Sequence, residues 1–178
     1  MKRFTLTDSL ILASLAILSV AFKAVFRLKL GLTGHSMFMV TLVLLLARGL
    51  VPVRGSVVGC GLVAGLLAMV MGIGKGGPLV LLKMLAPALA IEIVCVLLPK
   101  APWTRWQAVL AAWVGVVAWI GKGMVELAMA GADRTVMLTE AGMKALGGGF
   151  FATVAALLVP TLLRRLAQHD MIPAERQP

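Results

Sequence analysis

The chain has 178 residues, of which 61 % are hydrophobic and only 13 % are charged, and its mean hydropathy is +1.02. A water-soluble domain of this size does not have such a composition, so the sequence predicts an all-α integral membrane protein with one domain over residues 1–178. The net charge of +10 would suggest nucleic acid binding in a soluble protein. Here the basic residues flank or interrupt apolar stretches, so we expect a lipid bilayer and no nucleic acid as partner.

Six apolar stretches are each long enough to cross a bilayer, which takes about 20 mostly apolar residues. The predicted transmembrane helices cover residues 6–26, 33–50, 55–73, 78–99, 106–129 and 146–164. The longest polar connection, residues 131–144, precedes the sixth stretch.

Basic residues outside these spans are unevenly distributed between the two sides of the membrane. The side that holds both termini carries Lys2, Arg3, Arg48, Arg54, Lys100, Arg105, Arg164, Arg165 and Arg176. The other side carries Arg27, Lys29, Lys75, Arg134 and Lys144. Positive charge accumulates on the cytoplasmic side, so we expect both termini in the cytoplasm and a multi-pass protein of the inner (plasma) membrane.

The third span is rich in glycine. It contains the pairs Gly55/Gly59 and Gly61/Gly65, each with three residues between two small ones. Small residues on one face let helix backbones approach closely in lipid. We therefore expect this span to pack tightly against neighbouring helices.

Three lysines lie inside spans, namely Lys23 in the first, Lys83 in the fourth and Lys122 in the fifth. A charge at this depth costs about 2.5–3.5 kcal/mol on insertion scales, and such residues usually serve a function. In the predicted orientation all three lie in the outward half of the membrane, where Glu126 is the only acid within a span. Buried charges need partners, so the excess of positive charge predicts a bound anionic small molecule.

The predicted pocket lies beneath the glycine-rich connection between the third and fourth spans, which can move aside to admit a solute. Lys83 and Lys122 are expected to line the pocket, and Glu126 is expected to hold one of these two lysines. The rim is expected to consist of Lys23, His35 and Lys75. The candidate binding residues are Lys23, His35, Lys75, Lys83, Lys122 and Glu126. Two structural alternatives remain open. Lys83 can extend to the interface or pair with an acid, and Lys122 and Glu126 can form an ion pair within their helix.

Glu92 follows Lys83 by nine residues in the same span. It therefore points to the opposite side of the helix, about 14 Å further along the axis, and cannot pair with Lys83. We expect it to neutralise a basic residue of the cytoplasmic side or to face a partner subunit.

Signatures of an enzyme are absent from the sequence. It has no membrane-level Gly-x-Ser-Gly motif of a serine peptidase and no phosphate-binding glycine loop, so any ATP must be hydrolysed by another protein. A metal site needs clustered ligands, and the nearest approach is His35 with Met37 and Met39, which do not share a helical face. We expect no metal, no cofactor and no enzymatic activity, and we expect Cys60 and Cys95 to be buried and inert.

A family resemblance covers Gly34 to Glu92. It rests on GHSMFMVTLVLLLARGLVPVRGSVVGCGLVAGLLAMV and, after a glycine-rich loop, PLVLLKMLAPALA. These segments are similar to the second to fourth helices of vitamin-type S components, the substrate-binding subunits of energy-coupling factor (ECF) ABC transporters. The resemblance implies a solute site under the connections around Lys29, Lys75 and Arg134. It also implies a transmembrane coupling subunit and separate ABC ATPases as partners.

In this family two alanines four residues apart on the first helix contact the coupling subunit. This chain has Ser9 and Ala13 at that spacing, followed by Ala16, and we predict that these residues form the partner-docking surface. The chain also resembles the cobalt and nickel branch in general form. That branch begins Met-His and binds its ion there, whereas this chain begins MKR.

The leading interpretation is an S component that captures a small, anionic, vitamin-like nutrient. One alternative is an S component for a transition-metal ion. Another is a structural or accessory subunit of a different membrane complex, in which the glycine stripe and the span charges bind protein. The third alternative is a small membrane enzyme.

Overall fold

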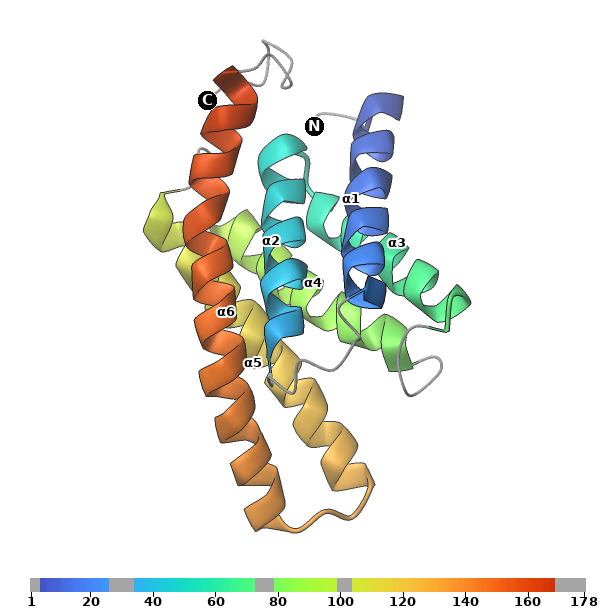
Figure 1. Ribbon diagram of the computed structural model, residues 1–178, viewed down its shortest axis with the longest axis vertical. Coiled ribbons are helices and arrows are strands. Elements are labelled where there is room, and N and C mark those ends of the chain that lie inside the picture. The colour runs from blue at the N-terminus through green and yellow to red at the C-terminus, as the bar shows by residue number, and fades with distance from the viewer. Residues whose placement is uncertain (1–3, 26–33, 73–78, 99–103, 169–178) are drawn as a thin grey trace.

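The computed structural model describes residues 4–25, 34–72, 79–98 and 104–168, and every regular element in these ranges is an α-helix (Figure 1). The helices are α1 (Leu6–Val25), α2 (His35–Leu50), α3 (Ser56–Val70), α4 (Leu79–Leu97), α5 (Arg105–Met129) and α6 (Arg134–Gln168). Helices α1 to α5 agree with the first five predicted spans to within a few residues. The predicted all-α class is therefore confirmed.

Helix α6 starts earlier than the sequence pattern predicts. It has 35 residues and begins at Arg134, so most of the predicted polar connection is helical. Asp133 starts the helix: its carboxylate accepts the N–H of Arg134 at 2.8 Å, and its carbonyl accepts that of Met137 at 3.0 Å. Hydropathy detects the apolar part of a helix and not a polar extension of it, which explains the late predicted start.

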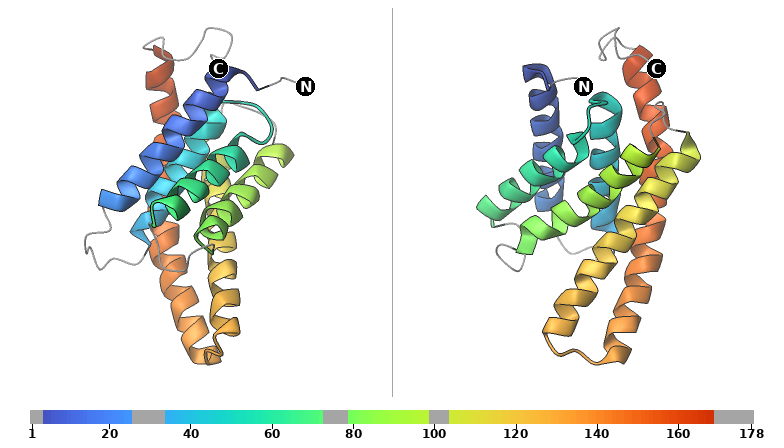
Figure 2. Two further views of the ribbon diagram at one scale, coloured as in Figure 1. Left: turned by 90° about the vertical axis from the view of Figure 1, so that its right-hand side faces the viewer. Right: turned by 180° about the vertical axis from the view of Figure 1, so that it is seen from behind.

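The length of α6 carries it beyond the other helices. At 1.5 Å per residue it is about 52 Å long, whereas the hydrocarbon core of a bilayer is about 30 Å thick. With α5 it forms a hairpin that extends past α1 to α4 at one end of the molecule (Figures 1 and 2).

Four helices, α1, α4, α5 and α6, are long and apolar enough to cross a membrane. Helices α2 and α3 are also apolar but have only 16 and 15 residues. Their lengths of about 24 and 22 Å are shorter than the hydrocarbon core. The described part of the chain is thus a multi-pass membrane protein with four spans by length and composition. The start of α1 and the end of α6 lie at the same end of the molecule (Figure 1).

Two glycines of α3 allow it to pack closely against α4. A Cβ atom added to Gly61 would lie 2.5 Å from the Cβ of Ala88, and one added to Gly65 would lie 3.3 Å from the Cα of Leu81. Neither position has room for a side chain without a shift of the neighbouring helix. The predicted close packing at the Gly61/Gly65 pair is confirmed.

The other glycine pair of this region has a different role. Gly55 precedes α3 and has a φ of 89°, a left-handed conformation that favours glycine. A Cβ on Gly59 would meet Leu12 at 3.9 Å, an ordinary contact distance. The Gly55/Gly59 pair therefore does not mark a close approach of helix backbones.

Glycines in the middle of α6 allow α2 and α5 to pack closely against it. A Cβ on Gly149 would lie 2.6 Å from the ring of Trp113, and one on Gly148 would lie 3.0 Å from the ring of Trp119. The start of α2 reaches the same point. Gly34 has a φ of 97°, and a Cβ there would lie 2.4 Å from the backbone nitrogen of Gly148. These close contacts set the spacing of α2, α5 and α6.

Glu92 connects α4 to α2 and α3. Its carboxylate accepts the N–H groups of Gly55 at 2.7 Å and Val57 at 3.0 Å, and it lies 3.6 Å from the guanidinium of Arg48. Arg48 also donates to the carbonyl of Val53 at 2.8 Å. The side chains of Arg48 and Glu92 are only 15 % and 10 % exposed. Of the two roles expected for Glu92, the structure shows the neutralisation of a basic residue.

Candidate functional site

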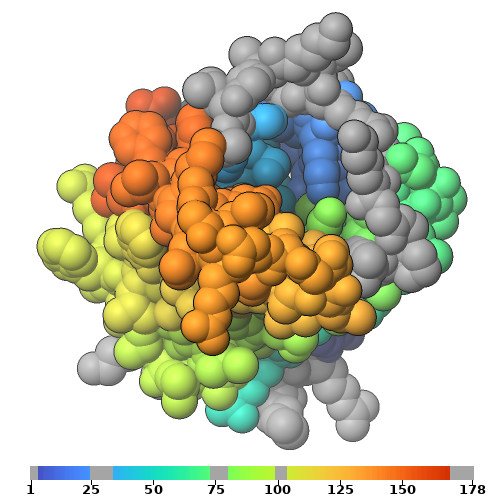
Figure 3. All heavy atoms as spheres, turned by 90° about the horizontal axis from the view of Figure 1, so that it is seen from below, coloured from blue at the N-terminus to red at the C-terminus, as the bar shows by residue number. Residues whose placement is uncertain are grey.

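A cavity of about 450 Å³ lies between α1, α2, α4, α5 and α6, near the end of α1 and the start of α2. Figure 3 shows the molecule from this end, where the hairpin of α5 and α6 stands beside α1 and α2. The described residues that line the cavity are Lys23, Ser36, Met37, Val40, Val80, Lys83, Met84, Trp119, Lys122, Gly123, Glu126, Leu127, Glu140 and Lys144. Its size falls within the range of roughly 300–1,000 Å³ that is typical of small-molecule sites.

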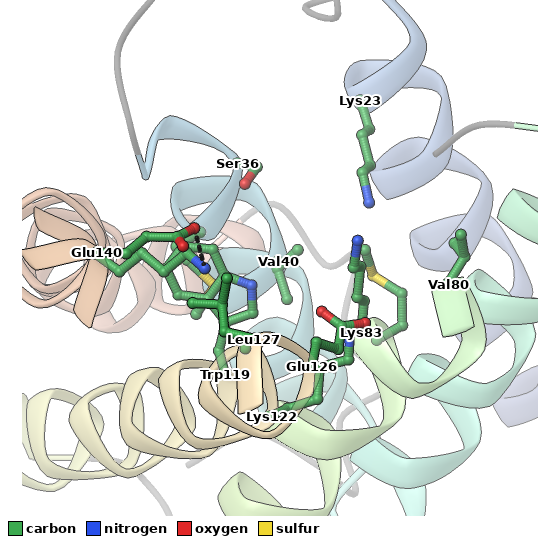
Figure 4. Close-up of a pocket in the computed structure, with 14 residues that line it drawn as sticks. Lys23, Ser36, Val40, Val80, Lys83, Trp119, Lys122, Glu126, Leu127 and Glu140 are labelled. Carbon is green, nitrogen blue, oxygen red and sulfur yellow. Dashed lines mark hydrogen bonds and ion pairs between the residues drawn. The ribbon is translucent and has the colours of Figure 1, made fainter. Parts of the chain in front are cut away.

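Four of the residues predicted for the site come together in this cavity. Lys23 belongs to α1, Lys83 to α4, and Lys122 and Glu126 to α5. Lys122 and Glu126 form an ion pair within their helix, and the side chain of Lys122 is only 7 % exposed. Figure 4 shows that the ammonium groups of Lys23 and Lys83 point toward one another from their separate helices.

The other two predicted residues are His35 and Lys75. His35 is the first residue of α2 and is not among the described residues of the lining, whereas the next residue, Ser36, is. Successive residues of a helix point about 100° apart, so only one of these two neighbours faces the cavity. Lys75 lies outside the described residues.

Sequence reasoning missed the contribution of α6. Lys144 forms an ion pair with Glu140 at 2.7 Å, and its ammonium nitrogen lies 5.7 Å from the centre of the Trp119 ring. Gly123 of α5 makes room for it, because a Cβ there would lie 3.0 Å from that nitrogen. The signal in the sequence is the four-residue spacing of Glu140 and Lys144, which places both on one face once the helix is extended.

The charges and the apolar wall together define what the cavity can bind. Its described lining has four lysines and two glutamates, a formal excess of two positive charges. Apolar side chains of Met37, Val40, Val80 and Met84 form another part of the wall. This combination suits a small molecule with an anionic group and an apolar body. Within the described ranges, no group of three or more His, Cys, Asp or Glu side chains is placed to hold a metal ion.

The predicted docking residues of α1 differ in accessibility. Ser9 is exposed and Ala13 is partly exposed, but Ala16 is 0 % exposed and belongs to the hydrophobic core of the chain. In this structure Ala16 packs within its own chain and is not accessible to a partner. The accessible part of the predicted surface is Ser9 and Ala13.

No family model and no curated protein matches the chain. One solved structure is similar over nearly its whole length: the crystal structure of an S-component of an ECF transporter, with a TM-score of 0.70 and 15 % sequence identity. The match covers 98 % of this chain and 92 % of the other. At this identity the likeness establishes the fold. The chain therefore has the fold of that S-component, as the sequence resemblance implied.

Proposed function

We propose that this chain is the substrate-binding S component of an ECF-type importer in the plasma membrane. The observation that carries the proposal is the similarity of the fold to an S-component over 98 % of the chain. In this function the chain captures a solute, while a transmembrane coupling subunit and separate ABC ATPases drive uptake. The chain itself hydrolyses no ATP.

The cavity at the end of α1 and the start of α2 is the proposed solute site, and the solute is a small, anionic, vitamin-like nutrient. Support comes from the cavity volume of about 450 Å³ and from the excess of positive charge in its lining. Lys83 and Lys122 contribute from α4 and α5. The proposed orientation, with both termini in the cytoplasm, places this cavity in the outward half of the membrane.

The function is tested by purification of the tagged chain from its native membranes in mild detergent. We expect a coupling protein and ABC ATPases to co-purify, and native mass spectrometry to detect a bound small molecule in the complex or in the chain alone. Recovery of the chain with a different membrane complex and without ATPases would refute the proposal and favour an accessory subunit.

The proposed contact with the coupling subunit uses the exposed small residues Ser9 and Ala13 of α1. Small side chains permit a close approach of helix backbones, and a bulky substitution prevents it. We expect Ala13→Trp to abolish recovery of the complex while the isolated chain still binds solute. The matched control is Val117→Trp, at a 63 % exposed position of α5, which should leave the complex intact. Equal recovery of both variants would show that α1 does not contact the coupling subunit there.

A further inference from the structure

Two kinds of lysine line the cavity. Lys122 and Lys144 each form an ion pair with a glutamate four residues away on the same helix. Lys23 and Lys83 come from different helices, α1 and α4, and Figure 4 shows their ammonium groups pointing toward one another. Two helices that are distant in sequence thus place two cations at one point of the cavity.

Two like charges that face one another in a partly buried site repel unless negative charge lies near them. The nearest acid of the wall, Glu126, is within electrostatic range of Lys83, but it is hydrogen-bonded to Lys122 and lies near Lys144 as well. Even with both glutamates counted, the described lining keeps two excess positive charges. The cavity also has space for an anionic group of a bound molecule.

We infer that Lys23 and Lys83 together form an anion-binding subsite that takes a carboxylate or a phosphate monoester. The apolar body of the ligand then extends along Met37, Met84 and the ring of Trp119. The pairs Lys122–Glu126 and Lys144–Glu140 are internally neutral and form the parts of the wall that belong to α5 and α6. The anion-binding subsite rests on the proposed function in one respect, because it takes this cavity as the solute site.

The first experiment uses probes of one shape and different charge. The purified full chain, in an uncharged maltoside detergent, is titrated with 1-naphthyl phosphate, 1-naphthoate and the neutral 1-naphthylmethanol, and binding is followed by the rise in melting temperature. We expect saturable stabilisation by at least one of the anions and at least tenfold weaker binding of the alcohol. The tighter anion identifies the ligand as a phosphate monoester or a carboxylate. Equal binding of the alcohol would overturn the inference.

The second experiment assigns the anion to its lysines. Lys23→Met and Lys83→Met should each weaken binding of the tighter naphthyl anion at least tenfold. The matched control is Arg164→Met, which removes one positive charge at an exposed position of α6 outside the cavity lining. This control should bind the anion within threefold of the original chain. Binding that is unchanged in both lysine variants, or that Arg164→Met weakens equally, would overturn the inference.

A third variant separates loss of binding from loss of folding. Lys23→Glu places a carboxylate opposite Lys83, where it substitutes for the anionic group of a ligand. We expect it to melt at a higher temperature than Lys23→Met and to show no stabilisation by the anion. A lower melting temperature than Lys23→Met would show that the two side chains do not share a subsite.

Failure of this inference and failure of the proposed function give different results. Co-purification of ATPases together with anion binding that is insensitive to Lys23 and Lys83 refutes only the subsite. Anion binding that depends on both lysines in a chain without ATPase partners refutes only the importer.

Discussion

At the level of single residues, two glutamates inside the helical bundle have different environments. Glu92 accepts two backbone N–H groups, those of Gly55 and Val57, and lies beside Arg48. Glu126 is 33 % exposed and pairs with a lysine of its own helix at the edge of a cavity. The first carboxylate is held by three groups from other elements and can contribute to stability. The second is accessible to a bound molecule.

We expect Glu92→Ala to destabilise the fold. The substitution removes the carboxylate beside Arg48, whose side chain is only 15 % exposed, and loss of one partner of a buried pair typically costs about 3–5 kcal/mol. The melting temperature of the purified chain should fall accordingly. Glu140→Ala is the control, because that glutamate is 41 % exposed and loss of an exposed pair costs at most about 1 kcal/mol. Equal melting temperatures of the two variants would contradict a stabilising role for Glu92.

At the level of the helices, glycine positions decide which pairs approach closely. On α3, Gly61 touches α4 at a distance that excludes a Cβ atom, whereas Gly59, two residues earlier, has ordinary space around it. Both glycines lie within α3, and the main difference between them is the contact of Gly61 with α4. The pair therefore isolates the effect of close packing from the effect of glycine on the helix itself.

Gly61→Ala should destabilise the chain, and Gly59→Ala should not. The methyl group on Gly61 collides with Ala88, and overpacking of this kind costs about 1–3 kcal/mol. On Gly59 the methyl group has space, and alanine is favoured over glycine in a helix by up to about 1 kcal/mol. Thermal melting of the two variants in the same detergent measures the difference. A Gly61→Ala variant as stable as Gly59→Ala would show that α3 and α4 separate easily.

At the level of the whole molecule, the two ends of the bundle have different character. The cavity, whose described lining has six charged residues, lies at the end where α5 and α6 extend beyond the other helices. The start of α1 and the end of α6 lie at the opposite end. The two ends of α6 therefore report which side of the membrane the cavity faces.

We expect Asp133→Cys, just before α6, to react from outside intact cells with a membrane-impermeant maleimide. Gln168→Cys, at the end of α6, should react only after permeabilisation, because both termini are predicted in the cytoplasm. The native Cys60 and Cys95 are buried and give little background. Labelling of Gln168→Cys in intact cells would reverse the orientation, and the cavity would then face the cytoplasm.

The sequence by itself determined the class of protein, the number of helices in the described part and most of their bounds. It also singled out Lys23, Lys83, Lys122 and Glu126 as charges at one depth. These properties follow from local information. Hydropathy along the chain marks the helices, and a fixed rise per residue converts position in a span into depth in the membrane.

Only the tertiary structure decided which way the helices face and which residues meet. It buries Ala16 in the core, turns Ser36 rather than His35 to the cavity, and brings in Lys144 by extending α6. It also joins Glu92 to the N–H groups at the start of α3, far away in the chain. In a helix that is apolar nearly all round, local sequence does not specify the inward face. That face is set by contacts with neighbouring helices, above all where glycine lets them approach.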